Sequence, residues 1–445
     1  MSVLIVFLGV GVLLLLVAVL RLNTFISFLI VAYGVALGLG MDPVPAAKSV
    51  QTGIGNILGS LVPILGLGAM LGKLVAESGG AQRITQTLIK WFGERYIQIA
   101  LVLTGFVVGI PMFYSVGFVI LVPLVFTVAA STRMPLLYVG MPMLASLSVA
   151  HGYLPPHPAP TAIAESFGAD IGLTLIYGIV IAIPAILVGG IFFSRFLKGF
   201  NPQPPEELYR KEVMPEEQLP PFGLSMFLAL LPAFLIAFKA LGGLFLPAVG
   251  EGGSFSDGVH YVLGMLGEPI IALLLSVVLA IWLLGLRNGR TMDGVMNELV
   301  ESVKAITMIL LIIAGAGALK QVLSDSGVSN EIAAYLSDVN ISPIILAWGI
   351  AAVIRICVGS ATVAGLTTVG IIQGMIASSG IAPELLVLAI GAGSLMFSHV
   401  NDSGFWMFKE YFNLSLKDTF KTWSVMETLV SIMGLIGTLV LSWIL

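Results

Sequence analysis

Long apolar stretches, each bounded by a short polar segment, make up most of this 445-residue sequence. A helix of about 20 apolar residues is long enough to cross a lipid bilayer. The pattern predicts continuous transmembrane spans at 3–20, 24–40, 57–77, 171–194, 221–247, 262–286, 303–322 and 421–445, and interrupted spans at 134–165 and 383–415. We therefore expect an all-α, multi-pass membrane protein.

Four polar interruptions inside the apolar pattern set this chain apart from a simple helix bundle. The segment 146–161 contains four prolines, which remove backbone donors and end helices. Unwound backbone is tolerated at membrane depth only where it is buried in protein or lines a watery cavity. We therefore predict unwound helix breaks at 146–161 and 394–406. The polar centres 109–117 and 357–365 are expected to be the tips of two re-entrant hairpins, or the turns between pairs of full spans.

An internal repeat relates the two halves of the chain. A shift of 248 residues aligns polar and proline positions without a gap: Ser131 with Ser379, Pro135 with Pro383, Ser146 with Ser394 and His151 with His399. Apolar residues coincide easily in such a composition, but serine, proline and histidine do not. The repeat favours a duplicated fold over a coincidence.

The repeat and the polar segments together predict the layout of the chain. In order, we expect N-terminal scaffold helices (1–56), a first repeat (57–198), a cytoplasmic linker (199–220), further scaffold helices (221–302), a second repeat (303–420) and a C-terminal helix (421–445).

Basic residues are distributed unequally between the two repeats. The first hairpin is flanked by Arg83, Lys90, Arg95 and Arg133, whereas the repeat-related positions carry no basic residue. Because cytoplasmic loops are enriched in Lys and Arg, the first hairpin is predicted to open to the cytoplasm and the second to the outside. The repeats are then inverted, with both termini outside. Inverted repeats with discontinuous helices are typical of secondary transporters.

Composition narrows the class of protein further. Hydrophobic residues make up 58% of the chain and charged residues 10%, and the mean hydropathy is +1.06. A soluble domain carries about 25% charged residues. The single cysteine, Cys357, excludes an intrachain disulfide, and no Cys/His cluster has metal-ligand spacing. No Walker loop is present, so ATP is not expected to drive the protein. We expect no cofactor, no metal and no nucleic-acid partner, and the lipid bilayer as its surroundings.

Five segments closely resemble the gluconate permease family of the ion transporter superfamily. They are L-G-A-M-L-G-K-L-V-A-E-S-G-G-A-Q-R-I (67–84), G-F-V-I-L-V-P-L-V-F-T (117–127), H-G-Y-L-P-P-H-P-A-P-T-A-I-A (151–164), G-S-A-T-V-A-G (359–365) and H-V-N-D-S-G-F-W (399–406). The resemblance implies proton-coupled import of gluconate and related sugar acids across a bacterial inner membrane. It also implies two hairpins, two unwound helices, a homodimer built on scaffold helices and an elevator mechanism. Many members carry an acidic residue where this chain has Ser115.

The two tips and two breaks are expected to converge on one substrate site. Helix N-termini carry partial positive charge and free N–H donors, which suit an anion. Gly359 lets a ligand approach the backbone, and Ser360 and Thr362 can donate to a carboxylate or to hydroxyl groups. Tyr114 and Ser115 belong to the first tip. The alternative is a helix-packing seam of small residues.

Three histidines and one acid of the breaks can bind substrate or carry a proton. His151 and His399 are repeat-related, and each can donate to an anion, titrate near neutral pH or cap a helix carbonyl. His157 is either a ligand donor or a loop residue. Asp402 is the first candidate for the coupling proton, with His151 second, because a charged carboxylate is costly at membrane depth. Otherwise Asp402 caps the helix that begins at Gly404.

The remaining candidates are polar residues of the second tip and the second break. Arg355 can grip the substrate carboxylate through two parallel hydrogen bonds or pair with an acidic neighbour as structure. Asn401 and Ser403 are expected to bind hydroxyl groups.

Three functions are open at this point. The first is a secondary active transporter that imports gluconate or a related hydroxy-acid anion by proton symport. The second is a sodium-coupled carboxylate transporter of the same architecture. The third is an intramembrane enzyme that uses the His/Asp pair, against which the inverted repeat argues.

Overall fold

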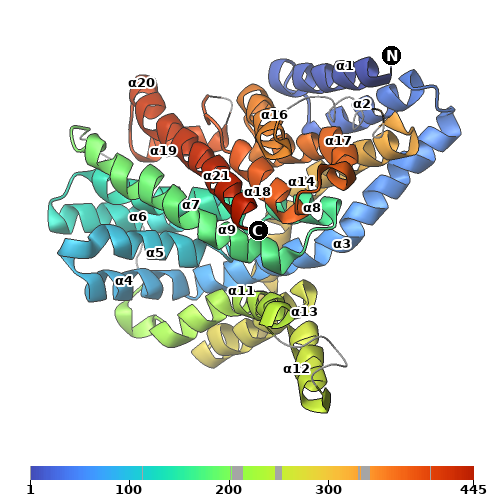
Figure 1. The fold of residues 1–445 in the computed structure, drawn as a ribbon. Coiled ribbons are helices and arrows are strands. Elements are labelled where there is room, and N and C mark those ends of the chain that lie inside the picture. Colours follow the sequence, from blue (N-terminus) through green and yellow to red (C-terminus); the bar gives the residue numbers. More distant parts are fainter. Residues whose placement is uncertain are drawn as a thin grey trace.

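The computed structural model describes residues 2–112, 114–200, 202, 214–245, 253–328, 331, 341–400 and 402–445. Every regular element within these residues is a helix, and no strand occurs among them (Figure 1). Most of the predicted linker 199–220 lies outside the described residues, as does Asn401. The all-α membrane fold predicted from the sequence is confirmed.

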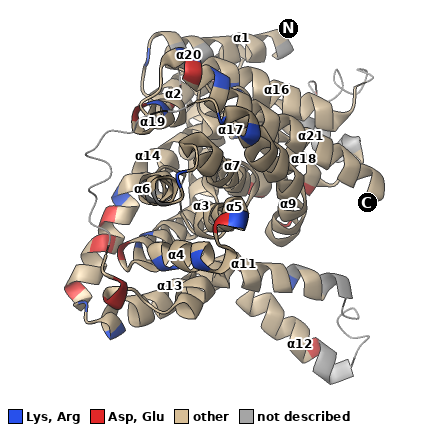
Figure 2. Cartoon of the chain, turned by 90° about the vertical axis from the view of Figure 1, so that its left-hand side faces the viewer, with Lys and Arg blue, Asp and Glu red and all other residues tan. Residues whose placement is uncertain are grey.

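Six helical segments of the described chain are long and apolar enough to cross a membrane, or seven if a bent pair counts as one span. The six are 43–77, 171–197, 222–239, 269–288, 292–325 and 416–444. Large hydrophobic side chains such as Phe7, Phe196 and Trp443 are exposed on them and on other helices. Uncharged residues cover most of the length of the helices in Figure 2. An exposed apolar surface of this extent is suited to lipid contact.

The two longest helices, α3 (Pro43–Glu77) and α14 (Met292–Asp325), pack antiparallel to each other. Near one end, Ser49 Oγ of α3 donates to Asp325 Oδ2 of α14 at 2.6 Å. At the crossing, a Cβ on Gly53 would lie 2.3 Å from the carbonyl oxygen of Gly317. Toward the other end, Ala69 and Glu301 line one small cavity. Glycine permits this close approach because it has no side chain.

Both long helices begin earlier than the predicted spans 57–77 and 303–322, and they run across the predicted unit boundaries at 56/57 and 302/303. The reason is the composition of their first halves. Many side chains there are too small or too polar to give a hydropathy signal. The two segments read P-V-P-A-A-K-S-V-Q-T-G-I-G-N and M-D-G-V-M-N-E-L-V-E-S-V-K-A. Small residues are instead favourable where two helices cross closely.

The first hairpin consists of α5 (Ile97–Gly109) and α6 (Tyr114–Thr132), and the second of α16 (Pro343–Val358) and α17 (Ala361–Ser379). An amphipathic helix, α4 (Gly80–Phe92), precedes α5 at an angle of 109°. Each turn is shorter than the predicted tip, because helix extends into 109–117 and 357–365 from both sides. Gly359 ends α16 with a φ of +81°, a left-handed conformation that suits glycine.

The two broken helices lie where the sequence placed them, but the first break is narrower than predicted. It separates α7 (Leu136–Tyr153) from α8 (Pro158–Phe167), so unwound backbone covers 154–157 and not the whole of 146–161. Helix α7 continues through His151, and Pro158 occupies the first turn of α8, where no backbone donor is needed. The second break separates α18 (Pro383–Gly393) from α19 (Ser403–Tyr411), and because α19 already begins at Ser403 this break is also narrower than the predicted 394–406.

The remaining elements are α-helices and short 3₁₀- or π-helical turns, which are labelled η. They are α1 (Ser2–Leu14), η1 (Leu15–Val19), α2 (Thr24–Gly38), η2 (Glu94–Tyr96), α9 (Ile171–Ile186), η3 (Leu187–Phe192), η4 (Arg195–Leu197), η5 (Glu216–Gln218), α11 (Phe222–Phe245), α12 (Gly253–Leu266), α13 (Pro269–Ala280), η6 (Ile281–Gly285), η7 (Leu286–Asn288), α20 (Leu416–Thr419), η8 (Phe420–Ser424) and α21 (Val425–Ile444). Helices α7, α9, α18 and α21 pack together between the first hairpin, at left in Figure 1, and the second, at upper right.

Three helices of the first half have counterparts of similar position in the described part of the second half. The first residues of α3, α6 and α7 recur 248 residues later, to within one residue, as those of α14, α17 and α18. The antiparallel packing of α3 and α14 brings each end of one helix next to the opposite end of the other, which is the arrangement that the predicted inverted repeat requires. The orientation of the halves in the membrane stays a prediction.

Candidate anion-binding site

A cavity of about 220 Å³ lies where the two hairpin turns and the second helix break meet. Three helices begin at its wall: α6 with Tyr114 and Ser115, α17 with Ser360 to Thr362, and α19 with Ser403 and Gly404. The first N–H groups of a helix have no partner within the helix and carry a partial positive charge. Three such ends around one small cavity favour a bound anion.

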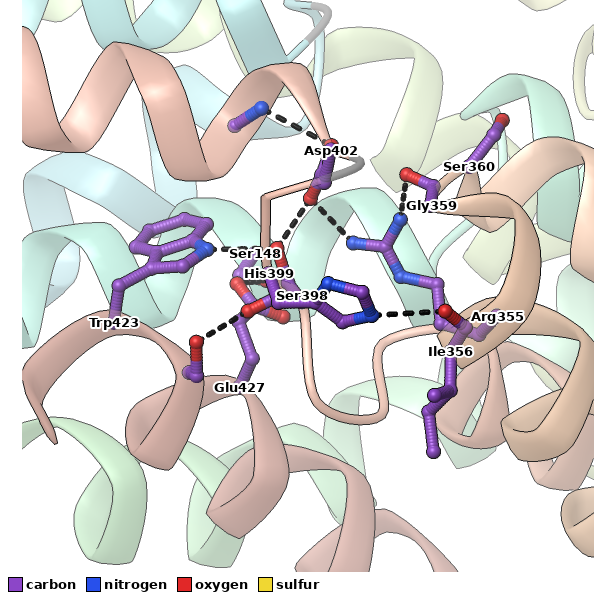
Figure 3. A network of polar contacts seen from close by, with 12 residues as sticks. Ser148, Arg355, Ile356, Gly359, Ser360, Ser398, His399, Asp402, Trp423 and Glu427 are labelled. Atoms are coloured by element: carbon purple, nitrogen blue, oxygen red, sulfur yellow. Dashed lines mark hydrogen bonds and ion pairs between the residues drawn. The ribbon is translucent and has the colours of Figure 1, made fainter. Parts of the chain in front are cut away.

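Arg355 of α16 is the one Lys or Arg on the cavity wall in the described part of the chain. Its side chain is 4% exposed, and its Nη2 lies 2.5 Å from Asp402 Oδ2 (Figure 3). Nη1 donates to the carbonyl oxygen of Gly359, and Nε is buried without a hydrogen-bond partner. The guanidinium therefore links the second hairpin turn to the second break and keeps one donor unused.

Asp402 also organises the second break. Its Oδ1 accepts from the N–H of Gly404 at 3.0 Å, which caps α19, and its Oδ2 accepts from Ser398 Oγ. Ser398 Oγ in turn accepts from Trp423 Nε1 at 2.8 Å (Figure 3). The structure therefore shows both of the structural roles considered for these residues: Asp402 caps α19, and Arg355 forms an ion pair with Asp402. Charge-assisted hydrogen bonds of this kind fix side chains in one orientation.

Glu427 of α21 is a second acid on the cavity wall, and the sequence analysis did not select it. Its side chain is buried, with 1% exposure, and Oε1 accepts from Ser148 Oγ of α7 at 2.6 Å. Oε2 is buried and has no hydrogen-bond partner. Figure 3 shows Glu427 and Ser148 close together beside Ser398 and Trp423. An acid within a helix that is long and apolar enough to span a membrane is rare and commonly functional.

Two further polar groups of the wall lack partners in the structure. Tyr114 Oη and His151 Nδ1 are buried and make no hydrogen bond, and the two rings lie with centroids 6.0 Å apart. Buried polar groups are normally paired in the resting protein. Unpaired ones at a cavity can receive hydrogen bonds from, or donate them to, a polar ligand.

The other two candidate histidines bind backbone instead of lining the cavity. His157 Nε2 lies 2.8 Å from the carbonyl oxygen of Gly109, at the end of α5. His399 Nε2 lies 2.8 Å from the carbonyl oxygen of Ile356, near the end of α16. Each imidazole therefore ties a helix break to the first helix of its own hairpin.

The structure brings most of the predicted site residues to one cavity. Those on its wall are Tyr114, Ser115, His151, Arg355, Gly359, Ser360, Thr362, Asp402 and Ser403. His157 and His399 are not on the wall, and Asn401 lies outside the described residues. The wall residues that the sequence analysis missed include Ser148, Trp423 and Glu427. The available signal for Glu427 was a lone acid within the apolar run 421–445.

The arrangement suits binding of a small polyhydroxy anion. Backbone N–H groups and Arg355 can hold a carboxylate, and Ser360, Thr362 and Ser403 can bind hydroxyl groups. Among the described residues, no group of three or more His, Cys, Asp and Glu side chains has the arrangement of a metal site.

Comparison with solved structures finds proteins of similar fold. The crystal structure of the Alcanivorax borkumensis YdaH transporter is similar with a TM-score of 0.65 over 94% of this chain and 97% of that one, at 16% identity. Neisseria gonorrhoeae MtrF is similar with a TM-score of 0.65 over 95% of this chain and 94% of that one, at 15% identity. At such low identity the likeness shows a shared fold.

Sequence comparison gives the family. The chain is 51% identical over its full length to a high-affinity gluconate transporter of Escherichia coli, whose full length is also covered. It is 48% identical to the L-idonate transporter of the same organism, covering 98% of each chain, and 44% identical to the gluconate permease of Bacillus subtilis, covering 99% of each. These relatives are transporters and permeases, not enzymes. Because the family model of the GntP permeases also matches residues 1–444, this chain is a membrane permease that belongs to the GntP family.

Proposed function

We propose that this chain imports gluconate or a closely related sugar-acid anion across the bacterial inner membrane by proton symport. The relatives named above transport gluconate or L-idonate, and they match the chain from end to end. Sugar acids share a carboxylate at one end and several hydroxyl groups along the chain. A site for them must therefore hold one negative charge and many hydrogen-bonding groups.

The observation that carries the proposal is the meeting of three helix N-termini and one arginine at a single cavity. The carboxylate is assigned to the N–H groups at the starts of α17 and α19 and to the guanidinium of Arg355. The hydroxyl groups are assigned to Ser360, Thr362 and the two unpaired groups on His151 and Tyr114. Small side chains and a glycine at the second turn leave space for close backbone contact.

The charge of the substrate supports coupling to a cation, and we assign that role to the proton. Import of an anion into a cell with a negative interior costs about 2.3 kcal/mol per 100 mV. A proton carried with each anion cancels that charge, so the membrane potential no longer opposes uptake and the pH gradient drives it.

We assign alternating access to a motion of the two hairpins and the broken helices relative to α3, α14 and the predicted scaffold helices. The antiparallel packing of α3 and α14 supports inverted repeats, which place one equivalent hairpin toward each side of the membrane. Ile309 of α14 lines the cavity beside residues of both hairpins, which supports a substrate position at the boundary between the two parts. The family resemblance implies that this motion is of the elevator type and that the protein is a homodimer.

Uptake of labelled gluconate into proteoliposomes tests the proposal. We expect an inside-alkaline pH gradient to drive accumulation, and a sodium gradient at fixed pH to have no effect. Unlabelled gluconate and L-idonate should compete, whereas glucose should not because it has no carboxylate. Stimulation by sodium without a pH gradient would favour a sodium-coupled carboxylate transporter, and effective competition by glucose would contradict the anion site.

A further inference from the structure

Among the described residues, the cavity wall contains one fixed positive charge and two acids. Arg355 lies 2.5 Å from Asp402, so the positive charge is already balanced by a partner. Glu427 lies on the same wall and makes no ion pair among the described residues. With Glu427 ionised, these three side chains carry a net charge of −1 and repel an incoming carboxylate. With Glu427 protonated, they are neutral and the anion meets only the helix N-termini and the guanidinium.

The surroundings of Glu427 accommodate both of its protonation states. Its Oε1 is 2.6 Å from Ser148 Oγ, and a hydroxyl can donate to a carboxylate or accept from a carboxyl group. Its Oε2 is buried without a partner, an arrangement that costs less for a neutral carboxyl group than for an ionised one. Asp402 differs on this point, because it accepts from Arg355, Ser398 and the Gly404 N–H. A proton on Asp402 would break its ion pair.

We propose that Glu427, not Asp402, carries the coupling proton of this transporter. On the outside, Glu427 gains one proton from water, which forms an O–H bond on the carboxylate and admits one substrate anion to the cavity. After the site opens to the inside, the anion leaves and the O–H bond breaks, returning one proton to water. One acid therefore couples one proton to one monovalent anion, and the complex that crosses the membrane is electrically neutral.

The groups that face Glu427 are few, and each has a part in this scheme. They are Arg355 of α16, Asp402 before α19, Tyr114 of α6, and His151 and Tyr153 of α7. Helices α9 and α18 also pack on α21, but neither brings a charged side chain to the cavity wall in the described residues. Arg355 and Asp402 keep their charges as a pair, and the tyrosines stay neutral at physiological pH. His151 is assigned to a substrate hydroxyl group through its unpaired Nδ1.

The inference rests on the proposed import function, and one experiment separates the two. The full-length protein is reconstituted as wild type, as Glu427→Gln and as Glu410→Gln, a matched change at an exposed acid of α19. With the potential clamped near zero, wild type and Glu410→Gln should accumulate gluconate about tenfold per unit of pH gradient, the ratio for one proton per anion. If the wild type fails to accumulate gluconate, the proposed function is wrong, whatever Glu427 does.

If the wild type accumulates gluconate, the behaviour of the Glu427→Gln protein tests the inference. We expect no accumulation above equilibrium and no substrate-dependent proton entry, measured with a trapped pH dye. Exchange of internal for external gluconate should persist at a reduced rate and lose the decline that raised pH causes in the wild type. Normal accumulation in this variant, persistent proton entry, or loss of exchange by folded protein would each overturn the assignment.

A second measurement uses the wild type and does not depend on the variant folding. Apolar carbodiimides react with protonated carboxyl groups within membrane proteins, and mass spectrometry locates the adduct. We expect labelling at Glu427 that increases as the pH is lowered, in parallel with loss of transport. The same pH-dependent labelling at Asp402, with none at Glu427, would contradict the proposal.

Discussion

The Arg355–Asp402 pair yields a prediction whose size follows from its burial. The two side chains are 4% and 15% exposed, and the charged atoms are 2.5 Å apart. Removal of one partner of a buried ion pair costs about 3–5 kcal/mol, because the other charge is left unbalanced. Asp402 keeps its bonds to Ser398 and Gly404 and borders the cavity, which reduces the penalty. We therefore expect Arg355→Gln to destabilise the protein by about 2–3 kcal/mol.

Substrate binding should respond separately from stability. If Arg355 donates to the substrate carboxylate, its loss removes a charge-assisted hydrogen bond of about 1.5–3 kcal/mol, which is about a 10- to 100-fold weaker affinity. The double variant Arg355→Gln/Asp402→Asn removes both charges. Its stability should return to within about 1 kcal/mol of the wild type, since no unbalanced charge remains, while its affinity for gluconate stays low.

The assays are thermal unfolding of the purified protein in detergent and equilibrium binding of labelled gluconate. Arg95→Gln, at an exposed arginine of η2, serves as the control and should change neither quantity. Gluconate binding by the double variant with the affinity of the wild type would refute the role of Arg355 in holding the carboxylate. An Arg355→Gln protein as stable as the wild type would refute the energetic importance of the pair.

Two further predictions concern the fold. Gly53→Ala should lower the unfolding temperature, because its Cβ would lie 2.3 Å from the carbonyl oxygen of Gly317, whereas Gly55→Ala has open space and should raise stability slightly through its higher helix propensity. Equal effects of the two changes on thermal unfolding would contradict the close crossing of α3 and α14. In a cysteine-free background, Arg95→Cys should react with an impermeant thiol reagent from the cytoplasmic side and Glu331→Cys from the outside. Labelling of both from one side would contradict the inverted repeats.

The helices and their interruptions could largely be predicted from the sequence, because hydropathy and proline report directly on the backbone. The turn at Gly359 and the break before Ser403 are examples. The width of the first break could not be predicted from proline content alone. Pro158 and Pro160 both lie within α8, so only part of the proline-rich stretch is unwound. Tertiary packing around α7 decides this extent, and the sequence pattern does not report it.

The candidate site was predictable where residues are related by the repeat or lie at an interruption. Glu427 has neither property, since it lies in the first turn of α21 within the continuous helical segment 416–444, and the residue 248 positions earlier is Ile179. Its position opposite Ser148 follows from the packing of α21 on α7, which joins segments 279 residues apart. His157 shows the converse case. Its motif is distinctive, yet its imidazole binds the end of α5 and not the cavity.

A structure of the protein with gluconate bound tests the central claim most directly. We predict that the substrate carboxylate lies within hydrogen-bonding distance of Arg355 and of the first N–H groups of α17 and α19, with its hydroxyl groups toward His151 and Tyr114. Gluconate bound elsewhere, for example in the small cavity between α3 and α14 that Ala69 and Glu301 line, would contradict the account.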